Sequence, residues 1–156
     1  MKHYNLKGQC NCGAVHYYLE EKPLFVHCCH CSYCQKETGS AFAINALIES
    51  RYIRLTAEEP VLTYFKTKSG HGQRIMRCPH CQIVLWSHYS SKKISFVRVG
   101  TLDQPELCPP DIHIYTSTKQ PWLVLSDDKP IKSGYYSPTR YWPPESLKRY
   151  ENLKQE

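Results

Sequence analysis

The chain has 156 residues, 41% of them hydrophobic, and a formal net charge of +6. This length fits one domain with its own core, and the apolar and aromatic content excludes an intrinsically disordered chain. The sequence has no apolar run of the roughly 18 residues that a membrane span needs, and its lysines and arginines are scattered. We therefore expect neither a membrane nor a nucleic acid as a partner.

Nine cysteines stand in a chain whose polar first ten residues lack the apolar segment of a signal peptide. We accordingly expect a cytoplasmic protein, where thiols are kept reduced and disulfides are rare. The odd count and the short, clustered spacings favour metal binding over disulfide bonds.

Short segments rich in β-branched and aromatic residues, separated by Gly, Pro, Asp and Ser, follow one another along most of the chain. They predict a mainly β domain built from several small antiparallel sheets. The predicted strands cover residues 13–20, 41–47, 52–55, 61–65, 74–76, 83–86, 93–99 and 112–116.

Two segments predict helices. Residues 32–38 can form one or two turns that end at Gly39. Residues 144–154 predict a short C-terminal helix, because proline suits the first turn and Leu147, Tyr150 and Leu153 share a face. Trp86 and Trp122 are expected in the core.

The first metal motif combines a C-x-C pair with a C-x-x-C pair. Cys10 and Cys12 form the first pair, and Cys78 and Cys81 form the second, 66 positions later. Each tight turn aims two sulfur atoms at one point, and two such turns complete a tetrahedron. The four cysteines therefore predict a closed structural zinc site.

The second motif is the run HCCHCSYC, in which two ligand triplets are possible. Cys31 and Cys34 can be completed by either Cys29 or Cys28. Adjacent residues of a strand point in opposite directions, so only one of these two is expected to face a metal. Spacing leaves the choice open, but Thr38 stands where a ferredoxin-type cluster would need its fourth cysteine.

Two uses of this triplet are possible. A structural site would take a fourth ligand from Cys108 or one of the eight histidines. A catalytic site would keep the fourth position open. Three thiolates make zinc a poor activator of water but a good ligand partner for a substrate thiol, and Lys36 is a candidate cation nearby.

The histidines near these motifs differ in their expected roles. His30 and His80 lie inside the metal turns and are expected to point away from the zinc ions. His113 lies between two isoleucines of a predicted strand, so alternation allows it to face a pocket.

Five motifs together resemble the glutathione-dependent formaldehyde-activating family, which is also related to centromere protein V. They read GQCNCGAV, CHCSYCQKETGSAFA, RCPHC, GTLD and HIYTSTKQPW. The resemblance covers about residues 8–130, leaves 131–156 as a C-terminal extension, and implies a single β-tent-like zinc-binding domain over residues 1–156. One departure is Gln82, which stands where the family usually has glycine.

The resemblance also implies which cysteines bind which of two zinc ions. Cys10, Cys12, Cys78 and Cys81 would hold the structural ion. Cys29, Cys31 and Cys34 would hold the catalytic ion, which leaves Cys28 as a non-ligand.

The activity that the resemblance implies is that of a carbon–sulfur lyase, an S-(hydroxymethyl)glutathione synthase. We expect a small thiol such as glutathione to bind the open zinc and to be joined to, or released from, an aldehyde such as formaldehyde. The rival hypothesis is a non-catalytic interaction module of the centromere protein V type, since a fold does not determine a function.

Overall fold

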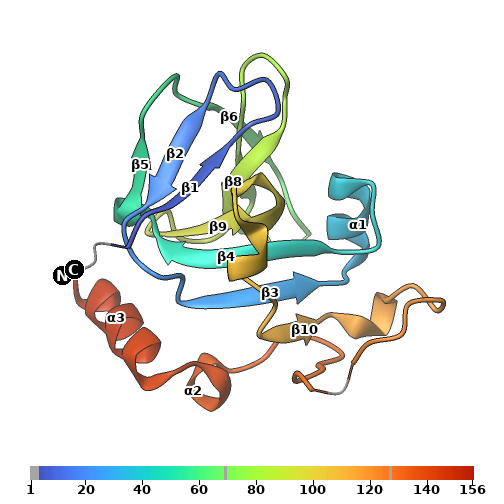
Figure 1. Ribbon diagram of the computed structural model, residues 1–156. Coiled ribbons are helices and arrows are strands. Elements are labelled where there is room, and N and C mark those ends of the chain that lie inside the picture. Colours follow the sequence, from blue (N-terminus) through green and yellow to red (C-terminus); the bar gives the residue numbers. More distant parts are fainter. Residues whose placement is uncertain (1–3, 69, 127) are drawn as a thin grey trace.

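The computed structural model describes residues 4–68, 70–126 and 128–156. A seven-stranded sheet with the order β10-β3-β4-β9-β8-β7-β6 forms its centre (Figure 1). All neighbours in this sheet are antiparallel except β10 and β3, which are parallel. Its strands are β3 (Phe25–Cys29), β4 (Ala43–Glu49), β6 (Val61–Phe65), β7 (Gln73–Arg77), β8 (Val84–His88), β9 (Ile94–Arg98) and β10 (Ile112–Ile114).

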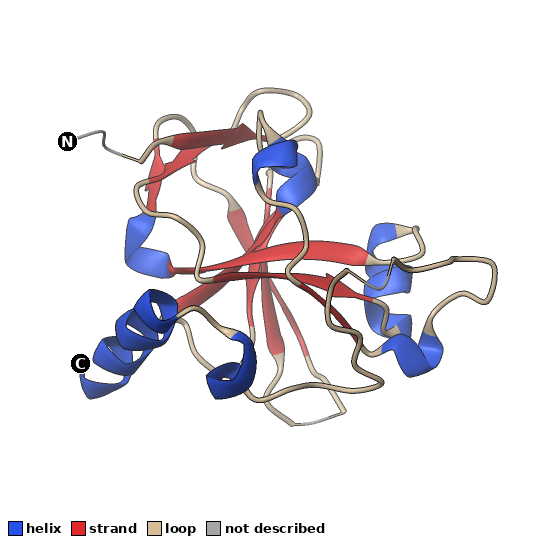
Figure 2. Cartoon of the chain, turned by 60° about the horizontal axis from the view of Figure 1, so that its bottom comes forward, coloured by secondary structure: helices blue, strands red, loops and turns tan. Residues whose placement is uncertain are grey.

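A smaller antiparallel sheet lies on one side of this centre and helices lie on the other (Figures 1 and 2). The small sheet consists of β1 (Leu6–Gln9), β2 (His16–Leu19) and β5 (Ile53–Leu55). One core cluster joins the two sheets, and Tyr17 and Trp86 are buried in it. A second cluster joins the large sheet to α2 (Pro138–Tyr141) and α3 (Pro144–Gln155) through Phe25, Trp142 and Leu153.

The remaining helical segments are short. Helix α1 (Ser32–Thr38) follows β3 and ends at Gly39, whose positive φ of 64° closes the last turn. Four single 3-10 turns lie at Ser50–Tyr52, Val99–Thr101, Pro105–Leu107 and Thr116–Thr118. None of the helices in the described part of the chain is long and apolar enough to cross a membrane.

The mainly β prediction is confirmed, as are both predicted helices. Each predicted strand overlaps an observed one, but β1 and β3 were not predicted. Strand β3 was not predicted for two reasons. Its sequence FVHCC is buried on both faces and so lacks an alternating pattern, and its cysteines suggest metal ligands rather than a strand. Trp86 is buried as predicted, whereas the prediction for Trp122 is wrong: it is 70% exposed, because the chain beyond β10 is an irregular loop.

A buried ion pair attaches the C-terminal helix to the sheet. Glu49, at the end of β4, is fully buried, and both of its carboxylate oxygens accept hydrogen bonds from Arg149 of α3, at 2.9 and 2.5 Å. Arg149 also donates to the backbone carbonyl of Lys22 at 2.8 Å. The helix is therefore fixed by a bidentate contact as well as by its apolar face.

Replacement of Arg149 by methionine should lower the free energy of unfolding by about 3 kcal/mol, because it leaves the Glu49 carboxylate buried without its partner. Urea unfolding followed by circular dichroism measures the change. Arg51→Met is the matched control, since Arg51 pairs with Glu156 where both side chains are about half exposed. Such a pair contributes roughly 0–1 kcal/mol. Equal losses in the two variants would contradict a role for buried pairing.

Candidate metal centres

The first group of sulfur atoms comes from two distant turns. The Sγ atoms of Cys10, Cys12, Cys78 and Cys81 all lie within 4.8 Å of one another. The Sγ–Sγ distances of Cys10–Cys12 and Cys12–Cys78 are both 3.6 Å. A tetrahedron with zinc–sulfur bonds of about 2.3 Å has edges of about 3.8 Å, so this donor set fits a zinc ion.

The two turns of this group share a backbone pattern. The amide of Cys10 donates to the carbonyl of Val15 at 3.1 Å, and the amide of Cys78 donates to that of Ile83 at 3.0 Å. The amide of Val15 in turn donates to the sulfur of Cys10 at 3.3 Å. Amide hydrogen bonds of this kind favour the thiolate, and the backbone of Ile83 likewise lowers the pKa of Cys81 to about 6.

Gln82 occupies the left-handed region in the second turn, with a φ of 63°. This is the position where the resembled family usually has glycine, which adopts such a conformation without strain. The backbone amide of Gln82 donates to the carbonyl of Cys78 at 3.1 Å, and its side chain donates to the carbonyl of Pro79 at 3.0 Å. The turn therefore keeps its geometry although the glycine is absent.

The second group consists of the sulfur atoms of Cys29, Cys31 and Cys34, again within 4.8 Å of one another. Cys29 ends β3, Cys31 caps the N-terminus of α1, and Cys34 lies on its first turn. The amide of Cys34 donates to the sulfur of Cys31 at 3.3 Å. Hydrogen bonds from the thiols of Cys29 and Cys34 lower the pKa of Cys31.

The triplet has no fourth ligand within the described ranges: no further Cys, His, Asp or Glu belongs to this group. Cys108, a candidate for that role, is buried instead in the core cluster between the two sheets. His80 is engaged elsewhere, with Nε2 2.7 Å from a carboxylate oxygen of Glu58. This arrangement resembles the open type of site rather than the closed type.

Cys28 lies apart from the triplet and belongs to a third group with His30 and His113. The strand therefore separates Cys28 from Cys29, as alternation requires. Spacing alone had left these two cysteines equivalent. The geometry brings Cys29, and not Cys28, to the other two sulfur atoms.

A buried cation lies on the triplet face of the sheet. Arg98 of β9 pairs with Asn45 of β4, and Asn45 pairs in turn with His27 of β3. His27 lies two residues before Cys29 and therefore on the same face of β3. The guanidinium of Arg98 donates to the side-chain oxygen of Asn45. Lys36, the cation suggested by the sequence, is exposed on α1.

The charges of the triplet affect the pKa values of two tyrosines. Burial, followed by the charges of the three thiols, raises the pKa of Tyr115. Burial and the charge of Cys34 raise the pKa of Tyr89, and the charge of Arg98 partly offsets this increase. Sequence reasoning missed these groups because they come from segments 50–90 positions away, and twelve tyrosines gave no means of choosing among them.

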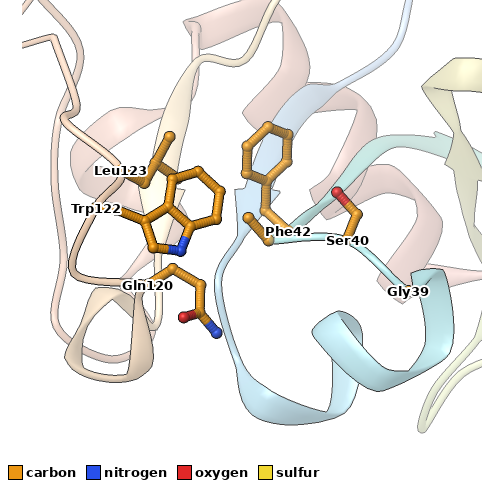
Figure 3. Close-up of a pocket in the computed structure, with 7 residues that line it drawn as sticks. Gly39, Ser40, Phe42, Gln120, Trp122 and Leu123 are labelled. Atoms are coloured by element: carbon orange, nitrogen blue, oxygen red, sulfur yellow. The ribbon is translucent and has the colours of Figure 1, made fainter.

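An open pocket of about 460 Å³ lies beside the triplet helix (Figure 3). The side chains of Phe42 and Trp122 lie next to each other in its lining. Gln120, at its floor, donates to the side chain of Gln35 at 2.7 Å, and Gln35 donates to the carbonyl of His30 at 2.8 Å. Its lining residues are Gly39, Ser40, Ala41, Phe42, Gln120, Trp122 and Leu123.

An ion pair joins the two sulfur groups. Arg77 precedes Cys78, and its Nη2 is 3.0 Å from a carboxylate oxygen of Glu37 on α1, with both side chains largely buried. The four-sulfur turn and the triplet helix are therefore in direct contact.

Cys78→Ser should lose the metal of the four-sulfur group and with it soluble folding, because structural zinc sites supply on the order of 10 kcal/mol in small domains. Metal analysis and circular dichroism of the purified protein measure both. Cys108→Ser is the control, since this buried thiol lies in none of the three groups. A folded Cys78→Ser protein with an unchanged melting temperature would exclude the structural role.

The chain is similar to a known protein family and, more distantly, to a solved structure. A crystal structure of a Rhodobacter sphaeroides protein, a structural-genomics target, matches with a TM-score of 0.48 and 24% identity, covering 62% of this chain and 87% of that one. No curated protein matches the chain. The family model described as "Glutathione-dependent formaldehyde-activating enzyme" matches residues 5–118, which begins and ends somewhat earlier than the expected 8–130 and contains all of the cysteines in the three groups. The chain therefore belongs to the glutathione-dependent formaldehyde-activating family.

Proposed function

We propose that the protein is a zinc-dependent carbon–sulfur lyase. It binds a small thiol such as glutathione at the triplet of Cys29, Cys31 and Cys34, and joins it to, or releases it from, a small aldehyde such as formaldehyde. The observation that carries the proposal is that these three thiols converge without a fourth ligand in the described ranges, next to a complete group of four. Membership of the family supports the same reaction class.

The two groups have different tasks in this proposal. Cys10, Cys12, Cys78 and Cys81 hold a structural zinc ion that clamps the small sheet to the large one. Cys29, Cys31 and Cys34 hold the catalytic ion. When bound there, zinc supplies a fourth position that keeps a substrate thiol in its nucleophilic thiolate form.

The chain's own residues stabilise the charge and supply the proton. Arg98, buried on the triplet face, offsets the negative charge of the sulfur atoms. Tyr115 keeps its phenolic proton, because burial and the three thiols raise its pKa. Tyr115 is 38% exposed, so solvent can return the proton that it donates.

The reaction balances without an oxidant or reductant. The thiol gives up its proton to solvent, a carbon–sulfur bond forms, and the carbonyl π bond opens. The carbonyl oxygen takes a proton from the phenol of Tyr115, which regains one from solvent. The reverse sequence releases the aldehyde.

The pocket between Phe42 and Trp122 supports a substrate larger than the reacting atoms. Its volume of about 460 Å³ falls within the range of small-molecule sites. Gln35 and Gln120 connect it to the loop that carries the triplet. We place the body of the thiol there.

The open position can be tested by cobalt substitution, because sulfur-to-cobalt charge-transfer bands report the number of bound thiolates. Added glutathione should strengthen these bands in the protein, and in the Cys108→Ser control. Binding should become stronger as the pH rises toward a thiol pKa of about 8.5, since the thiol loses a proton on binding. Cys29→Ser should lose both the second metal and the response to thiol.

Two results would contradict the proposal: a spectrum that saturating thiol leaves unchanged, and an untreated protein that already shows two complete four-sulfur sites. The triplet would then be structural. The alternative of a non-catalytic interaction module would take its place.

Tyr115→Phe should lower kcat about 10²-fold, which is at the low end of what a general acid contributes, while thiol binding to the cobalt protein stays the same. Steady-state kinetics of adduct formation measure the first quantity, and the charge-transfer bands the second. Tyr64→Phe is the control, because Tyr64 is 52% exposed and lies on β6, at the opposite edge of the large sheet from β10 and β3. An unchanged kcat would remove Tyr115 from the mechanism.

A further inference from the structure

The third group, Cys28, His30 and His113, is assembled by the backbone. In the parallel pairing of β10 with β3, His113 lies directly opposite Cys28. Paired residues of neighbouring strands project to the same face, and so do residues two apart along one strand. His30 follows Cys28 by two positions, so all three side chains are brought to the face opposite Cys29.

The three ligand atoms converge on one point. Nε2 of His30 lies 3.5 Å from Sγ of Cys28 and 3.0 Å from Nδ1 of His113. With zinc–nitrogen bonds of about 2.05 Å and zinc–sulfur bonds of about 2.3 Å, a tetrahedron has N–S and N–N edges of about 3.6 and 3.4 Å. The observed separations are close to both values.

Hydrogen bonding alone does not account for this convergence. The ring nitrogen Nε2 has either one proton or one lone pair in the plane of the ring, so it can make one good hydrogen bond there. It nevertheless meets two partners, whereas the buried Nδ1 of the same ring meets none among the described residues. A metal ion accounts for the two partners of Nε2, because all three groups then direct a lone pair at the same centre.

We infer that Cys28, His30 and His113 form a third metal site, which binds one zinc-class divalent ion through one thiolate and two neutral imidazoles. Zinc accepts this ligand type, and imidazole together with thiolate excludes calcium and magnesium. The site leaves one position open. It lies on the opposite face of β3 from the triplet and is independent of the lyase proposal.

The surroundings of the site suit a partly accessible ion. Cys28 and His30 are fully buried, whereas His113 is half-buried. The ring of Phe42 packs edge-on against His30, at 5.5 Å between centroids, and also lines the pocket. Two charged side chains act on the histidines. The positive charge of Lys119 disfavours positive charge at His30, whereas the negative charge of Asp128 favours positive charge at His113.

Cobalt titration of the protein with its two zinc ions in place tests the inference. One further equivalent of Co²⁺ should bind with tetrahedral absorption and the charge-transfer band of a single thiolate. Zinc content, measured in the same samples, should stay at two per chain. Zn²⁺ added afterwards should displace the cobalt.

Two variants identify the ligands. Cys28→Ser should abolish the thiolate band and weaken the third equivalent at least about 100-fold, since loss of even an outer partner costs 10–100-fold. His113→Gln should weaken binding similarly. Both should retain two zinc ions, and Cys108→Ser should bind the third ion like the parent.

Three outcomes would overturn the inference: no third equivalent, a third equivalent without a thiolate band, or a third equivalent that neither variant weakens. If Cys28→Ser does not fold, His113→Gln decides alone, because His113 is half-buried and its replacement leaves the core intact.

Discussion

Side chains alternate between the two faces of β3, and the positions of the candidate metal-binding groups depend on this alternation. Cys28 and Cys29 are adjacent in the chain, but the strand turns one sulfur toward the small-sheet side and the other toward the helices. Had the run of cysteines lain in a flexible loop, all four could have met at one point. In a fully buried strand held between β4 and β10, they cannot.

The neighbours of β3 then determine what each face contains. On the Cys29 face, the cross-strand row of His27, Asn45 and Arg98 places a guanidinium on the same side of the sheet as the sulfur atoms. On the Cys28 face, the parallel register of β10 adds His113. The two faces therefore differ in chemistry: one combines three thiols with a cation and phenols, and the other combines one thiol with two imidazoles.

Local motifs were predictable and long-range neighbours were not. The four-sulfur group followed from the spacing of its cysteines, because a tight turn fixes where two sulfurs point whatever the rest of the chain does. The helix at residues 32–38 followed from Gly39 for a similar local reason. The choice between Cys28 and Cys29 could not follow from spacing, since it depends on which strand face meets α1. Arg98, Tyr115 and the third group depend on strand register, which a single sequence does not reveal.

The same reasoning explains why a buried cation matters more than an exposed one at the triplet. Lys36 is closer in sequence, but an exposed charge is weakened by water and salt. Arg98 is 7% exposed and hydrogen-bonded to Asn45. Its charge therefore acts through the protein interior, whose dielectric constant is much lower than that of water. Three thiolates, a divalent ion bound among them and one guanidinium would sum to zero charge, so a fourth thiolate bound there would leave one negative charge. Burial, followed by the charges of the three thiols, raises the pKa of Tyr115, and in the proposed mechanism both effects keep the phenol protonated until it donates its proton.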